Sequence, residues 1–150
     1  RARLNLNPKD TDKRPDNEDQ IFDEELKKML NEEKDLILEA KLAGFNAQGI
    51  PGVFKILVVC EDSAGEDHMD IRIDRLINRE QQSLEAAKQE VIEREKNDIE
   101  KWRRMYAGGD QNWVYWDRKY YDFVVNTYSH NAEESLNLVL KQLGFPKKTS

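Results

Sequence analysis

Residues 102–128 read WRRMYAGGDQNWVYWDRKYYDFVVNTY, and this stretch decides how the chain packs. It contains all three tryptophans, all five tyrosines and one of the five phenylalanines of the 150-residue chain. Because large aromatic side chains dominate the energetics of cores and interfaces, we expect the principal packing site here. Gly108 and Gly109 divide the stretch, so its first part is expected to end one helix and its second part to start another.

Beyond these glycines, Asp110 is a potential N-cap, and the large side chains that follow recur on one face at helical spacing. These side chains are Trp113, Trp116, Tyr120, Phe123, Val124 and Tyr128. We therefore predict an aromatic helix that packs with a last helix as a small C-terminal helical cap. The last helix is expected to follow Asn131, which forms a capping-box pattern with Glu134, and to end in a Schellman motif at Gly144 and Phe145.

Residues 70–106 contain neither glycine nor proline and carry many charges. This pattern predicts one long charged helix of roughly 55 Å. Its narrow apolar stripe would support only a short coiled coil. An earlier helix is predicted from Asn17 to about Gly44, with Phe22, Leu26, Met29 and Ile37 at helical spacing.

The first sixteen residues contain Pro8 and Pro15 and read as an extended arm, so we expect an arm at 1–16 and a single helical domain at 17–150. The arm is mildly basic, which suits a segment left after removal of a transit peptide and equally a chain trimmed at that point.

Residues Val53–Cys60, VFKILVVC, read as a buried strand or a buried helical turn, because periodicity alone does not separate the two. A lone strand leaves its backbone groups unpaired, and the only internal strand partner we identify is the N-terminal arm. We therefore favour helix or irregular structure here. The predicted fold class is mostly α, with at most one short strand pair.

The composition excludes several classes of protein. Hydrophobic residues make up 38% and charged residues 36% of the chain, and the net charge is −6. An acidic chain lacks the basic footprint of a sequence-independent nucleic-acid binder, so direct contact with nucleic acid is not expected. We find no apolar run of the ~18 residues that span a membrane. The single cysteine, Cys60, cannot form an internal disulfide, which predicts an intracellular reducing compartment: cytosol, nucleus, or organelle matrix or stroma.

Few residues carry recognisable chemistry. Glu66, Asp67, His68 and Asp70 form a His–carboxylate group whose spacing matches no familiar metal loop, so we expect a solvated acidic loop. Cys60 with a histidine would resemble a nucleophile and its base, but the acids that follow Cys60 raise a thiol pKa, so we expect an inert buried thiol. The glycine-rich segment 44–52 lacks the Lys-Ser/Thr ending of a phosphate-binding loop. We predict no catalytic residue, no metal ligand and no cofactor.

The sequence therefore favours a non-catalytic scaffold or adaptor subunit that docks on a larger multiprotein assembly through the aromatic helix, the N-terminal arm and the long charged helix. Tryptophan and tyrosine are enriched at binding hot spots, so the expected protein-binding residues lie in the aromatic stretch. They are Trp113, Tyr115, Trp116, Arg118, Tyr120 and Tyr121.

Two alternatives remain open. Interleaved basic and aromatic side chains would suit a nucleic-acid-associated accessory factor that uses Arg103, Arg104, Arg118 and Lys119. The His68 group would suit a small metal-dependent enzyme.

Overall fold

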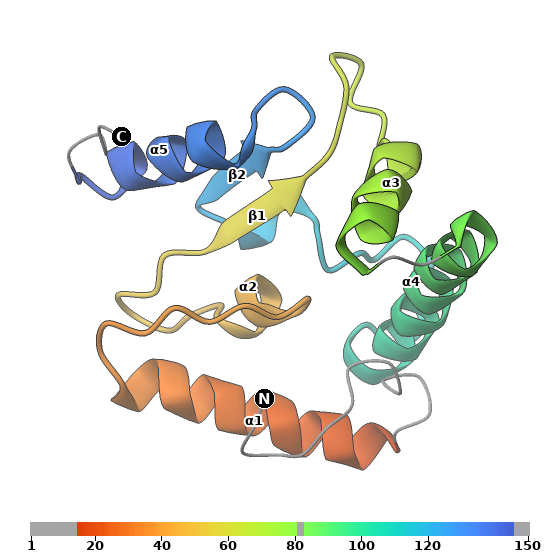
Figure 1. Cartoon of the computed structure of the whole chain (residues 1–150). Coiled ribbons are helices and arrows are strands. Elements are labelled where there is room, and N and C mark those ends of the chain that lie inside the picture. The colour runs from red at the N-terminus through yellow and green to blue at the C-terminus, as the bar shows by residue number, and fades with distance from the viewer. Residues whose placement is uncertain (1–14, 81–82, 146–150) are drawn as a thin grey trace. The chain divides into compact units, whose positions relative to one another are not determined.

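The computed structural model describes residues 15–80 and 83–145 (Figure 1). Its elements, in chain order, are α1 (Asp16–Glu32), α2 (Ala43–Asn46), β1 (Ile56–Val59), α3 (Met69–Glu80), α4 (Leu84–Tyr106), the 3-10 helix η2 (Arg118–Tyr120), β2 (Phe123–Asn126) and α5 (Ala132–Gln142). The predicted class, mostly α with at most one short strand pair, is confirmed. The predicted N-terminal arm lies almost entirely outside the described residues.

The chain divides into two compact units. Unit 1 comprises the residues up to Val53 together with Gln89–Tyr120. Unit 2 comprises Phe54–Lys88 together with the residues from Tyr121 onward. The aromatic stretch is therefore shared between the units, because its last residues belong to unit 2.

In unit 2, β1 and β2 form a two-stranded parallel sheet in which Ile56 pairs with Phe123 and Val59 with Asn126. The preference for helix or irregular structure at Val53–Cys60 is therefore wrong, because β1 has a strand partner among the described residues. The partner is a second short apolar run, Phe123–Asn126, that sequence periodicity had assigned to an aromatic helix. Both segments are strands because the backbone N–H and C=O groups of each form hydrogen bonds with those of the other.

The predicted last helix is present as α5, which packs against β2. The Asn131 side chain accepts a hydrogen bond from the Glu134 N–H at 2.9 Å, and the Glu134 carboxylate accepts one from the Asn131 N–H at 2.8 Å. At the other end Gly144 adopts a φ of +79°, and the Phe145 N–H donates to the Leu140 carbonyl at 2.8 Å. The capping box and the Schellman motif are both confirmed.

The predicted continuous helix over 70–106 is not formed. Helix α3 ends at Glu80, and Ser83 stands outside α4, which begins at Leu84. The Ser83 hydroxyl accepts a hydrogen bond from the Ala86 N–H at 3.3 Å, as an N-cap does. The missing signal was this serine, because the absence of glycine and proline does not exclude a helix start within the segment.

The first helix is also shorter than predicted. Helix α1 ends at Glu32, Glu33 is extended, and Asp35 adopts a left-handed φ of +57°. Ile37, which the helical pattern placed on the buried face, is 96% exposed.

No aromatic helix follows Gly109. The Asp110 carboxylate accepts a hydrogen bond from the Asn112 N–H at 2.9 Å, and the Asp117 carboxylate accepts one from the Lys119 N–H at 3.0 Å. These aspartates close turns, because their short side chains compete with helical backbone pairing. Only η2 is helical before β2 begins at Phe123.

Among residues 15–80 and 83–145, the structure contains no helix long and apolar enough to cross a bilayer.

We predict that Asn131→Ala lowers the free energy of unfolding by about 1 kcal/mol, because it removes the side-chain cap of α5. Chemical denaturation monitored by circular dichroism measures the change. Asn131→Asp is the matched control, since it keeps an acceptor at the N-cap. Equal stabilities of Asn131→Ala and the unaltered chain would contradict the prediction.

Candidate functional site

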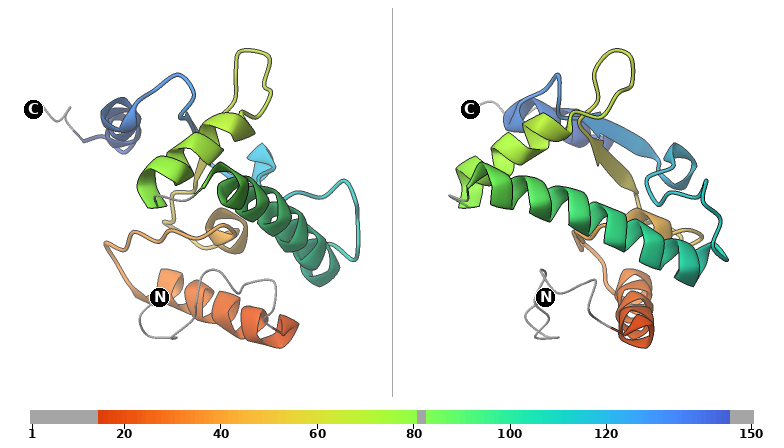
Figure 2. Two further views of the ribbon diagram at one scale, coloured as in Figure 1. Left: turned by 45° about the vertical axis from the view of Figure 1, so that its right-hand side comes forward. Right: turned by 90° about the vertical axis from the view of Figure 1, so that its right-hand side faces the viewer.

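In unit 1, α1 lies near the C-terminal half of α4 (Figure 2). Charged side chains connect the two helices there. The Lys101 ammonium lies 2.5 Å from the Asp19 carboxylate, and both residues are buried. One turn earlier on α1, both carboxylate oxygens of Asp16 accept hydrogen bonds from Arg104, with nitrogen–oxygen distances of 2.8–3.1 Å. One turn later, Asp23 accepts a hydrogen bond from the Tyr106 hydroxyl. We call these three contacts the α1–α4 seam.

The environment of the seam shifts the pKa values of its titratable side chains. Hydrogen bonds from Arg104 lower the pKa of Asp16, because they stabilise the carboxylate. Burial is the main cause that raises the pKa of Asp23, and it also raises the pKa of Tyr106.

A second charged group in unit 1 surrounds Asp98, which is only 1% exposed. The Lys41 ammonium lies 2.5 Å from its Oδ2, and the Arg94 Nε lies 4.0 Å from the same oxygen. Lys41 also lies over the ring of Trp102, at 5.8 Å from the centroid. We call Lys41, Arg94, Asp98 and Trp102 the Asp98 cluster.

Local structure explains how the Asp98 cluster forms. Helix α4 places Arg94 and Asp98 on one face, four residues apart. Lys41 comes from the turn before α2, whose neighbour Leu42 is buried and anchors the turn. The Lys41 and Arg94 side chains remain 38% and 33% exposed. Two partly exposed cations thus lie beside one buried carboxylate.

The residues predicted to bind a protein partner lie mainly in ring contacts within unit 1. Phe45 contacts the rings of Trp113 and Tyr120 at centroid distances of 5.2 and 5.1 Å. Tyr115 lies between Trp102 and Trp116, at 5.0 and 4.7 Å. These half-buried aromatics form the packing site that the sequence predicted.

Two residues of the predicted protein-binding set stand apart from these rings. Arg118 is exposed on η2. Tyr121 belongs to unit 2, where burial raises its pKa to about 12. The structure therefore does not gather the six predicted residues on one element.

The basic residues predicted for the nucleic-acid alternative serve contacts within the chain. Arg103 donates to the Trp113 carbonyl at 3.0 Å, and Arg104 belongs to the α1–α4 seam. Lys119 lies 2.7 Å from Asp117 and 4.8 Å from the Tyr120 ring centroid. These contacts account for their spacing without a nucleic-acid ligand.

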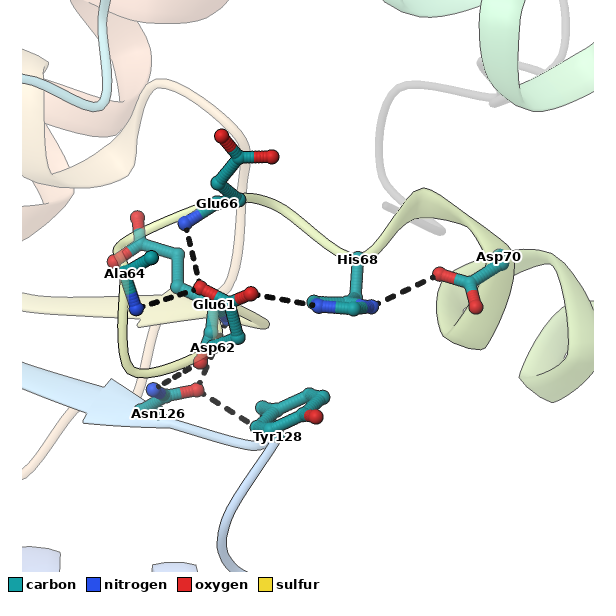
Figure 3. Close-up of polar contacts among 8 residues, drawn as sticks. All are labelled: Glu61, Asp62, Ala64, Glu66, His68, Asp70, Asn126 and Tyr128. Atoms are coloured by element: carbon teal, nitrogen blue, oxygen red, sulfur yellow. Dashed lines mark hydrogen bonds and ion pairs between the residues drawn. The ribbon is translucent and has the colours of Figure 1, made fainter.

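In unit 2, side chains join the carboxyl ends of the two strands (Figure 3). The Asn126 amide donates to the Glu61 carbonyl at 2.7 Å and accepts from the Glu61 N–H at 3.1 Å. Arg75, on α3, donates to the Thr127 carbonyl at 2.8 Å and to its hydroxyl at 2.9 Å. The carboxyl edge of a parallel sheet is the usual place of ligand sites in such folds.

His68 lies at this edge between two carboxylates (Figure 3). Its Nε2 lies 3.4 Å from Asp62 and its Nδ1 lies 3.2 Å from Asp70, while its ring contacts Tyr128 at a centroid distance of 4.6 Å. The hydrogen bond with Asp62 is the main cause that raises the pKa of His68.

The structure does not assemble the predicted metal group. Asp67 pairs with Arg72 at 2.8 Å, and the Glu66 carboxylate points away from His68 (Figure 3). Across residues 15–80 and 83–145, no group of three or more His, Cys, Asp or Glu side chains is arranged to hold a metal ion. Cys60 is buried, as expected, with the Arg75 guanidinium 3.9 Å from its sulfur.

The chain resembles archaeal cytidylate kinases. It is 24% identical to the cytidylate kinase of Archaeoglobus fulgidus over 86% of this chain and 64% of that relative. It is 30% identical to the enzyme of Natronomonas pharaonis, over 81% of this chain and 58% of the relative. The enzyme of Haloarcula marismortui is 28% identical over 90% of this chain and 65% of the relative. The chain thus spans about three fifths of the length of the curated relatives it matches. No family model and no solved structure matches.

These similarities overturn the functional expectation drawn from the sequence. Seven relatives match, and each of them is named cytidylate kinase, an enzyme that acts on a nucleotide. The predictions of a non-catalytic scaffold, of a complex subunit with protein partners, and of no enzymatic role were therefore wrong. They depended on an aromatic helix and on a continuous helix over 70–106, neither of which is formed.

The Asp98 cluster was missed because its members lie far apart in the sequence. Lys41 and Asp98 are separated by 57 positions, so no local motif joins them. The one local signal was the four-residue spacing of Arg94 and Asp98 on a helix, which an exposed salt bridge produces equally well.

We predict that His68 titrates above its ordinary pKa of about 6.5. The folded protein then holds the proton more tightly than the unfolded chain. The resulting stabilisation is fully present below the unfolded pKa and is lost as the pH rises through the folded pKa. NMR titration of the His68 ring measures this.

Asp62→Asn should lower the His68 pKa, because it removes the main hydrogen-bond partner of the imidazolium. Asp74→Asn, at an exposed position of α3, is the matched control and should leave the titration unchanged. A His68 pKa at or below its ordinary value in the unaltered chain would refute the assignment.

Proposed function

We propose that this chain acts in a nucleotide kinase and binds cytidylate as the acceptor of a phosphoryl group. The observation that carries the proposal is the similarity to cytidylate kinases, which covers 72–90% of the chain. Similarity of that extent draws on both compact units, because neither unit alone contains so many residues.

The Asp98 cluster supports binding of the acceptor phosphate. A phosphate monoester carries about −1.5 to −2 charges near neutral pH. Lys41 and Arg94 are partly exposed cations beside one buried carboxylate, and a phosphate that contacts both forms charge-assisted hydrogen bonds with them. The role of Asp98 is to hold these two long side chains together, which reduces the entropy lost when the anion binds.

In the proposed reaction, a phosphate oxygen of cytidylate attacks the terminal phosphorus of a nucleoside triphosphate. The new P–O bond forms as the bond to the leaving diphosphate breaks, and two nucleoside diphosphates result. Catalysis of this kind consists mainly of positioning and charge stabilisation. The 150 residues contain no GxxxxGK[ST] segment to hold the donor phosphates. We therefore assign acceptor binding to this chain and test transfer as a separate step.

We predict that Lys41→Met weakens cytidylate binding by about 10-fold or more, since a hydrogen bond to a charged group contributes about 1.5–3 kcal/mol. Isothermal titration calorimetry with the full chain measures the affinity. Lys96→Met removes the same charge from an exposed position of α4 and is the matched control.

Phosphoryl transfer is tested by incubating the chain with cytidylate and ATP and measuring cytidine diphosphate. Binding with transfer supports the full proposal, and binding alone supports the acceptor-binding role. A chain that neither binds cytidylate at millimolar concentration nor forms the diphosphate would refute the proposal.

We also propose that the protein works in a reducing compartment. Its single thiol, Cys60, is buried and free. Finding the protein in an oxidising secretory compartment, by imaging of a tagged form, would contradict this.

A further inference from the structure

Charged contacts hold the first half of α1 in unit 1. The buried residues of α1 are Asp19, Asp23 and Leu26, so two of the three are carboxylates. A helix that docks on a core ordinarily buries an apolar stripe. On α1 the α1–α4 seam adds charged contacts to the apolar ones, with Asp16, Asp19 and Asp23 facing α4 on successive turns.

The carboxylates of the seam occupy cations that suit an anionic ligand. Arg104 contacts both oxygens of Asp16, in the geometry with which guanidinium groups also grip phosphate. The Lys101 ammonium faces Asp19 in a buried position. Burying such a pair is costly, because desolvation offsets much of the attraction between its charges. The contacts of the seam therefore stabilise the docking of α1 less than their number suggests.

The seam also adjoins the proposed acceptor site. Lys101 lies three residues beyond Asp98 on α4, so the two belong to neighbouring positions on the helix surface. An anion at the Asp98 cluster is thus close to the cations that hold α1. The third contact differs, because the Tyr106 hydroxyl is neutral and attracts an anion less strongly than Arg104 or Lys101 does.

We propose that α1 is an internal competitor of phosphate: Asp16 and Asp19 occupy Arg104 and Lys101, and a phosphate-bearing ligand displaces these carboxylates and releases the N-terminal end of α1. The identity of the natural ligand rests on the proposed function. The competition itself does not, because any compact polyanion tests it.

Hydrogen–deuterium exchange of the full chain, with and without inorganic pyrophosphate, tests the displacement. We expect pyrophosphate to accelerate amide exchange in the first half of α1 by about threefold or more, in line with the modest strength of exposed ion pairs. Sodium chloride at equal ionic strength controls for screening and should have a smaller effect. Unchanged exchange at saturating pyrophosphate would overturn the proposal, as would an equal effect of the chloride.

The affinity for pyrophosphate provides the second measurement. Asp16→Asn removes a competing carboxylate that is partly exposed, so the variant should fold and bind pyrophosphate about threefold more tightly. Glu25→Gln makes the same change of charge at an exposed position of α1 and should leave the affinity unchanged. Equal tightening in both variants would overturn the proposal, as would no binding by either.

The two proposals fail separately. If pyrophosphate accelerates exchange in α1 but the chain does not bind cytidylate, the proposed function is refuted and the competition stands. If cytidylate and pyrophosphate both bind but exchange in α1 does not change, the competition is refuted and the proposed function stands.

Discussion

The parallel pairing of β1 with β2 is the constraint on which the described structure depends. Parallel strands cannot be joined by a tight turn and require a long crossover. Residues 60–122 form that crossover here, so α3, α4 and the aromatic turns all come after one strand and before the other in the sequence. The pairing also brings Asn126 beside Glu61 and Thr127 beside Arg75, which orders the carboxyl edge of the sheet.

Unit 1 is held by a different balance of forces. Its aromatic rings gather around Phe45 and Trp102, and this apolar packing lowers the local dielectric constant around the neighbouring charges. Buried ion pairs contribute little net stability, while removing one partner is costly. Under the proposed function, the buried Asp98 and Asp19 position the neighbouring cations for a ligand.

Several features followed from local sequence alone. The capping box and Schellman motif of α5 were recognisable because each involves residues three to five positions apart, and helix ends obey such short-range rules. The aromatic packing site was likewise evident from composition. The errors arose where a neighbour distant in the chain decided the outcome. Ile56–Val59 fits a strand or a helical turn, and Phe123–Asn126 fits the helical spacing of the aromatic stretch. Their mutual hydrogen bonds make both of them strands.

The candidate site shows the same division. The sequence by itself determined a mostly helical, acidic chain with its aromatics in one place and with defined ends for its last helix. Only the tertiary structure decided that Lys41 meets Asp98 and Arg94, and that the acids of α1 meet Lys101 and Arg104. The physical reason is the separation along the chain over which each interaction acts. Caps and helical periodicity act within one or two turns, whereas a charge finds its partner through space, across 57 positions for Lys41 and 88 for Arg104.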